Sequence, residues 1–129
     1  MKTTFLWANR AIGAMDATTG LLLMFAPSLT LRLMRLPDLA SESMVYLSWI
    51  GAFVFAIGMS YLFVGPHSHE ERVKLLWQFT AFARAVIAVF VTAQVLCGNL
   101  SAGWLTVAAT DASVAMLQCW ALSRSKWKR

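Results

Sequence analysis

The chain has 129 residues, of which 59% are hydrophobic and only 13% are charged, and its formal net charge is +5. A typical soluble domain carries about 25% charged residues, and a chain this short cannot bury so large an apolar fraction inside itself. The composition therefore argues against an ordinary soluble domain and predicts an integral membrane protein.

Four apolar segments follow one another along the chain. They cover residues 5–26, 44–64, 73–97 and 102–123. Each has about 20 residues or more, enough to cross about 30 Å of hydrocarbon at a rise of 1.5 Å per residue. Pro27 ends the first segment, because proline lacks the amide hydrogen that a continuing helix needs, and Gly65-Pro66 closes the second. We therefore predict an all-α fold, an antiparallel four-helix bundle that forms one transmembrane domain over residues 1–129.

A shorter amphipathic stretch connects the first two segments. Within residues 28–36, leucines and arginines alternate at helical spacing: Leu29, Leu33 and Leu36 on one side, Arg32 and Arg35 on the other. This pattern is typical of a short helix that lies in the membrane interface.

Lysine and arginine counts predict the orientation. With four spans, both termini and the central loop fall on one side of the membrane. That side carries Lys2, Arg72, Lys74, Arg124, Lys126, Lys128 and Arg129, and the other carries Arg32 and Arg35. Cytoplasmic segments are the ones rich in basic residues, so both termini are predicted to be cytoplasmic in an inner (plasma) membrane. No nucleic-acid-binding motif accompanies these charges, so we assign them to topology and anionic lipid headgroups.

Three ionisable side chains are predicted to reach the same depth. Asp16 and Arg84 lie eleven residues into their segments, about 16 Å from the cytoplasmic side, and Asp111 lies nine residues in, about 14 Å from the opposite side. Charges at such depth are costly unless they are paired. We therefore expect Asp16 and Asp111 to flank Arg84, whose planar guanidinium can serve two carboxylates. Such a layer has three possible roles: it holds the helices of the bundle together, it binds a ligand or partner, or it couples to protons or ions.

A shallower polar layer is predicted nearer the cytoplasm. Arg10, Tyr61 and Gln118 fall within roughly 5–9 Å of that surface. For Arg10 and Gln118 the alternative is that they extend to the lipid headgroups.

Motifs of common enzymes and metal proteins are missing. There is no Ser-His-Asp set, phosphate-binding Walker loop or metalloprotease helix. The segment His67-Ser68-His69-Glu70-Glu71 has no second cluster of metal ligands and is interpreted as a solvated turn. We therefore predict neither enzymatic activity nor a metal site.

The chain resembles the DoxX-like group of small four-span membrane proteins. The shared features are the pattern Arg10-x-x-Gly13-x-x-Asp16-x-x-x-Gly20, the following Ala26-Pro27, Trp49-Ile50-Gly51 with Gly58, and Arg84. This resemblance implies a membrane subunit tied to quinone-linked oxidation or an assembly factor, and it transfers no catalytic residues.

A second resemblance is to the small multidrug resistance family. The stretch Asp16-Ala17-Thr18-Thr19 is similar to the membrane-embedded carboxylate region in the first helix of that family. Aspartate replaces the usual glutamate, and Arg84 would neutralise a carboxylate that must exchange protons. This alternative implies a small proton-coupled transporter that acts as an oligomer.

The sequence thus predicts a non-catalytic membrane protein. It would act as an accessory or anchoring subunit of a larger membrane complex or a homo-oligomer, or it would bind a small hydrophobic ligand, a quinone or lipid, at its charged layer.

Overall fold

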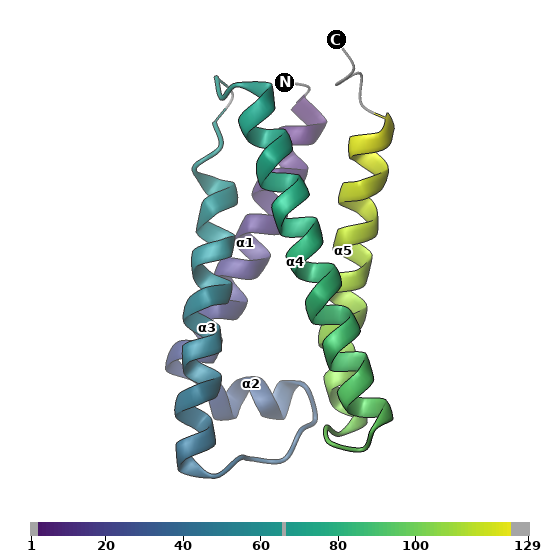
Figure 1. The fold of residues 1–129 in the computed structure, drawn as a ribbon. Helices are drawn as coiled ribbons and strands as arrows, with labels where there is room; N and C mark the ends of the chain where they lie inside the picture. Colours follow the sequence, from purple (N-terminus) through teal and green to yellow (C-terminus); the bar gives the residue numbers. More distant parts are fainter. Residues whose placement is uncertain (1–2, 66, 125–129) are drawn as a thin grey trace. The chain divides into compact units, whose positions relative to one another are not determined.

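The structure, a computed structural model, describes residues 3–65 and 67–124. It contains α1 (Thr3–Phe25), α2 (Pro27–Leu33), α3 (Ser41–Leu62), α4 (Glu70–Leu96), the 3-10 turn η1 (Ala102–Trp104) and α5 (Leu105–Arg124), shown in Figure 1. No strand occurs among these described residues, so the predicted all-α class is confirmed. Pro66 and four of the basic residues used to predict orientation lie outside the described part: Lys2, Lys126, Lys128 and Arg129.

The long helices begin and end within about three residues of the predicted segments, and local chemistry explains their ends. Pro27 follows α1 directly and stands at the first position of α2, where its missing amide hydrogen costs nothing. α4 ends at Leu96, and Gly98, two residues further on, has a φ of +77°. Its amide donates to the Val95 carbonyl and the Asn99 amide to the Gln94 carbonyl, a Schellman motif in which glycine takes the left-handed position without strain.

Three helical stretches within the described residues are long and apolar enough to cross a membrane. They are Ser41–Leu62, Glu70–Leu96 and Ala102–Arg124. α1 has a similar length, 23 residues, but Asn9, Arg10 and Asp16 interrupt its apolar sequence, and it is not among the three. The predicted first span therefore stays a prediction.

The chain divides into two compact units, Met1–Glu70 and Glu71–Arg129. The first contains α1, α2 and α3, and the second contains almost all of α4 together with α5. The prediction of one transmembrane domain concerns the arrangement of these two units and stays a prediction.

In the first unit, α1 and α3 approach each other closely through four glycines. Gly13 and Gly20 lie one heptad apart on α1, and so do Gly51 and Gly58 on α3. A Cβ atom added to Gly58 would lie 2.8 Å from the Gly13 carbonyl oxygen and 2.9 Å from the Ala17 Cα atom. Such short distances leave no room for any side chain, so the two backbones are in direct contact, as small residues permit between membrane helices.

The short amphipathic helix is present as α2. Figure 1 shows it running crosswise to α1 and α3 at the end of their hairpin. Of the three leucines predicted to share one face, only one is buried. Leu36 is buried, but Leu29 and Leu33 are exposed, and Leu31 takes their place inside at 1% exposure. The helix therefore has two apolar sides, one that packs inward and one that faces out.

Candidate functional site

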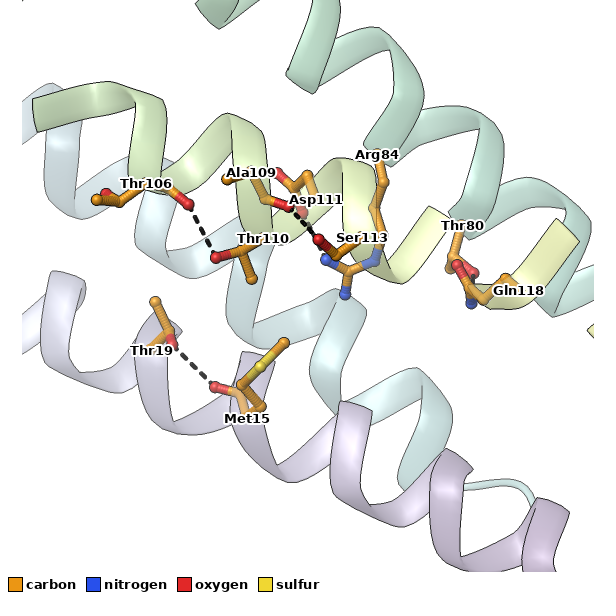
Figure 2. A network of polar contacts seen from close by, with 10 residues as sticks. All are labelled: Met15, Thr19, Thr80, Arg84, Thr106, Ala109, Thr110, Asp111, Ser113 and Gln118. Carbon is orange, nitrogen blue, oxygen red and sulfur yellow. Dashed lines mark hydrogen bonds and ion pairs between the residues drawn. The ribbon is translucent and has the colours of Figure 1, made fainter. Parts of the chain in front are cut away.

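The central feature of the second unit is an ion pair between α4 and α5. Arg84 lies near the middle of α4, and its Nη1 atom is 2.5 Å from the Oδ1 atom of Asp111 on α5. The Arg84 side chain is 7% exposed and that of Asp111 is 14% exposed. The structure thus brings these two predicted charges into direct contact; Figure 2 labels both side chains. Their depth in a membrane stays a prediction.

A second polar contact joins the same two helices. The Gln118 amide donates to the Thr80 hydroxyl oxygen at 3.0 Å, and that hydroxyl donates onward to the Leu76 carbonyl oxygen at 2.8 Å. Thr80 and Gln118 are 1% and 0% exposed. Because Thr80 precedes Arg84 by four residues and Gln118 follows Asp111 by seven, the two contacts lie one above the other along one antiparallel helix pair.

The first unit carries its own buried polar side chains on α1. Asp16 is 6% exposed and lies on the same face as Gly13 and Gly20, because residues three, four and seven apart share a helix face. Asn9, seven residues before Asp16, is fully buried, and its amide Nδ2 atom donates to the Tyr61 carbonyl oxygen at 2.5 Å. The predicted meeting of Asp16 with Arg84 and Asp111 joins residues of different units and stays a prediction.

The three residues of the predicted shallow layer differ in exposure. Tyr61 and Gln118 are fully buried. Arg10 is exposed, and its guanidinium lies 5.9 Å from the centre of the Trp7 ring. Arg124 lies in the same way over Trp120, at 5.0 Å. An exposed arginine over an exposed tryptophan is the arrangement expected where a helix meets lipid headgroups.

Two buried polar residues of the long helices, Asn9 and Thr80, were not predicted from the sequence. Both have signals that were available. Asn9 precedes Asp16 by one heptad, and Thr80 precedes Arg84 by one turn, so each shares a helix face with a charge already singled out. An uncharged polar residue at helical spacing from a buried charge is therefore a useful sign of a polar face.

The arrangement places an oriented hydrogen-bond donor between α4 and α5. Among the described residues, no group of three or more His, Cys, Asp or Glu side chains is placed to hold a metal ion. Arg84 offers a planar set of N–H donors that can serve several acceptors at once. Its carboxylate partner fixes the guanidinium in the middle of the helix pair, where a ligand carbonyl or phosphate oxygen would meet an oriented donor.

Comparison with known proteins adds no relative. The chain matches no protein-family model, no curated protein and no solved structure. The resemblance to the DoxX-like group and that to the small multidrug resistance family therefore both remain hypotheses drawn from the sequence.

Proposed function

We propose that this chain is an integral membrane protein in which α1, α3, α4 and α5 all span the bilayer. The three long apolar helices support this, as do large apolar side chains that face outward, such as Phe63, Val89 and Leu96 at 79%, 71% and 81% exposure. The exposed hydroxyls of Thr106, Thr110 and Ser113 on α5 each donate to a backbone carbonyl three or four residues earlier. Figure 2 shows the bonds of Thr110 and Ser113. Such internal bonds satisfy polar groups where no water is present.

In this proposal both termini face the cytoplasm of a cell with an inner membrane. The excess of lysine and arginine at the chain ends and in the central loop supports that orientation. The stacked pairs of Arg10 with Trp7 and of Arg124 with Trp120 support it too, since they stand near the ends of α1 and α5 that would meet the cytoplasmic headgroups.

For its role, we propose that the protein is non-catalytic and binds a small lipid-soluble ligand, a quinone or a lipid, beside Arg84, as an accessory or anchoring subunit. The ion pair of Arg84 with Asp111 carries this proposal. Holding two opposite charges in the membrane interior costs free energy, whereas polar contacts between membrane helices contribute on average only about 0.6 kcal/mol. Intramembrane charges therefore mark function more often than simple adhesion.

The chemistry fits ligands that carry an oxygen acceptor on an apolar body. A quinone carbonyl, a lipid ester or a phosphate oxygen accepts hydrogen bonds from a guanidinium in its plane. The apolar remainder of such a ligand would stay in the bilayer beside the exposed faces of α4 and α5. A charged water-soluble metabolite would have to leave water entirely and is disfavoured.

Ligand analysis of the intact protein tests this role. The full chain is solubilised in mild detergent, and native mass spectrometry records bound quinone, bound lipid, copy number and co-purified partners. We expect a retained ligand that Arg84→Gln loses and that the control Arg10→Gln, an exposed arginine, retains. A ligand that remains on Arg84→Gln, or no ligand and no partner on the wild-type protein, would refute the proposed role.

A proton-coupled transporter that acts as an oligomer is the second candidate, because a carboxylate, that of Asp16 at 6% exposure, is buried on α1. Membrane-embedded carboxylates serve proton relays in transporters. In that case, reconstituted vesicles would show proton-driven flux that Asp16→Asn abolishes and Asp38→Asn, a change of an exposed aspartate, does not. A protein that binds ligand but supports no flux would favour the accessory role.

A further inference from the structure

α2 presents a mixed apolar and cationic face on its outer side. Leu29 and Leu33 are 50% and 68% exposed, and the Arg32 side chain is 73% exposed. On the inner side Thr30, Leu31 and Leu36 are buried, so the helix is fixed to its unit. If α1 and α3 span the bilayer, α2 lies at the membrane surface, because it connects the end of one to the start of the other.

The end of α2 contains an unusual arginine. The Leu36 amide donates to the Leu31 carbonyl, and the Arg35 amide to the Arg32 carbonyl, which is again a Schellman motif. Arg35 occupies its left-handed position with a φ of 57° and is the only described residue other than glycine with a positive φ. Glycine takes this position at the end of α4, where it costs nothing. An arginine in a strained backbone conformation points to a use for its side chain.

The electrostatics of this segment favour an anion. Arg32 and Arg35 are both exposed. The carboxylate of Asp38 lies 3.9 Å from Arg32, with about half of the Asp38 side chain exposed. An exposed ion pair at that distance contributes little to the stability of the fold. A phosphate can therefore replace the Asp38 carboxylate beside Arg32 at little cost.

We propose that the outer face of α2 binds the headgroup of an anionic phospholipid, with Arg32 and Arg35 on the phosphate and Leu29 and Leu33 among the acyl chains. Guanidinium groups bind phosphate in a bidentate way, and a surface with exposed leucines beside arginines matches the boundary between headgroups and chains. This inference depends on the proposed membrane placement but not on the ligand role of Arg84.

Lipid retention in defined bilayers tests the inference. The full chain is placed in nanodiscs of phosphatidylcholine, with and without added phosphatidylglycerol, and native mass spectrometry measures retained phosphatidylglycerol. We expect each change, Arg32→Gln and Arg35→Gln, to lower retention about fivefold. Asp38→Asn should raise retention, because it removes the competing carboxylate. The comparison variant Arg72→Gln removes an equal charge at the start of α4. It should lower retention by no more than about twofold, because Arg72 supplies only general attraction to anionic headgroups and does not belong to the arginine and leucine face of α2.

Arg35→Gly separates backbone strain from lipid binding. Glycine fits the left-handed conformation, so in pure phosphatidylcholine the melting temperature should rise by about 3 °C, while retention of phosphatidylglycerol falls as in Arg35→Gln. Unchanged retention in the Arg35 variants, or an equal fall in Arg72→Gln, would overturn the inference. A chain that does not insert into the discs would instead refute the proposed membrane placement.

Discussion

The two helical hairpins hold their helices together by different chemistry. In the first unit, α1 and α3 meet through Gly13, Gly20, Gly51 and Gly58, with backbone against backbone. In the second unit, α4 and α5 are joined by two side-chain contacts, Arg84 with Asp111 and Thr80 with Gln118. Each hairpin also buries large apolar side chains, such as Tyr61 in the first and Trp77 in the second, while many others face outward.

This difference follows from the solvent that we propose for the protein. In a bilayer, lipid tails are as apolar as leucine, so close packing and interhelical hydrogen bonds must hold the helices together. Glycine packing holds α1 against α3 without any polar side chain. The polar contacts of α4 and α5 instead place an oriented cation inside the proposed membrane domain. The first hairpin is therefore suited to be the scaffold, and the second is the better candidate for binding.

The largest effect should come from filling the glycine contact. In Gly58→Leu, the new side chain would meet the backbone of α1, where the Ala17 Cα atom lies 2.9 Å from the first added atom. Because backbone cannot move aside as a side chain can, we expect a loss of about 3 kcal/mol in the free energy of unfolding.

Unfolding by sodium dodecyl sulfate in mixed micelles, followed by tryptophan fluorescence, measures this loss. Gly65→Leu is the matched control, because an added Cβ atom there meets nothing within 4 Å. Equal stability of the two variants would show that α1 and α3 do not approach as closely as the structure indicates.

A smaller loss is expected in the second hairpin from removal of its cation. Arg84→Ala leaves Asp111, with its side chain only 14% exposed, without the Arg84 guanidinium, and we expect a loss of about 2 kcal/mol in the same assay. Replacing both partners, Arg84→Met with Asp111→Leu, should recover stability, since an apolar pair needs no compensation.

The triple variant, which adds Asp16→Leu, tests the predicted three-charge layer. If Asp16 belongs to that layer, only the triple variant recovers full stability, because the double variant leaves a buried carboxylate behind. Recovery in the double variant alone would place Asp16 outside the layer. No loss in Arg84→Ala would show that the ion pair contributes nothing to the fold.

The sequence predicted the helices well because their boundaries depend on local chemistry. Apolar length, Pro27 and the glycine at position 98 act within a few residues, so the segments can be recognised from the chain alone. The depth calculation also brought Arg84 and Asp111 to one level, since the helical rise is constant. The sequence alone could not show that Leu31 packs inward while Leu29 and Leu33 face out. Both sides of α2 are apolar, and only tertiary packing selects the buried one.

Rotation about the helix axis was the harder quantity to predict. Arg10 and Asn9 are adjacent in sequence, yet Asn9 is fully buried and Arg10 is exposed. A step of one residue turns a side chain by about 100° around the helix. Depth alone singles out the charged Arg10, whereas the spacing of Asn9 from Gly13 and Asp16 identifies the buried face of α1.

The smallest effect should come from single uncharged hydrogen bonds, one in each hairpin. In Asn9→Ala, the Tyr61 carbonyl loses the amide at 2.5 Å but keeps a bond from the Val64 amide at 3.3 Å. In Gln118→Ala, the Thr80 hydroxyl keeps its bond to the Leu76 carbonyl. Because the partner group stays satisfied in both cases, each change should cost only about 0.6 kcal/mol in the micelle assay. The two hairpins would then differ in their largest contributions to the free energy of unfolding, the glycine contact and the ion pair. Their single uncharged hydrogen bonds would contribute equally. A loss well above 1 kcal/mol in Asn9→Ala would mean that the first hairpin too depends on polar contacts, and its role as an inert scaffold would have to be abandoned.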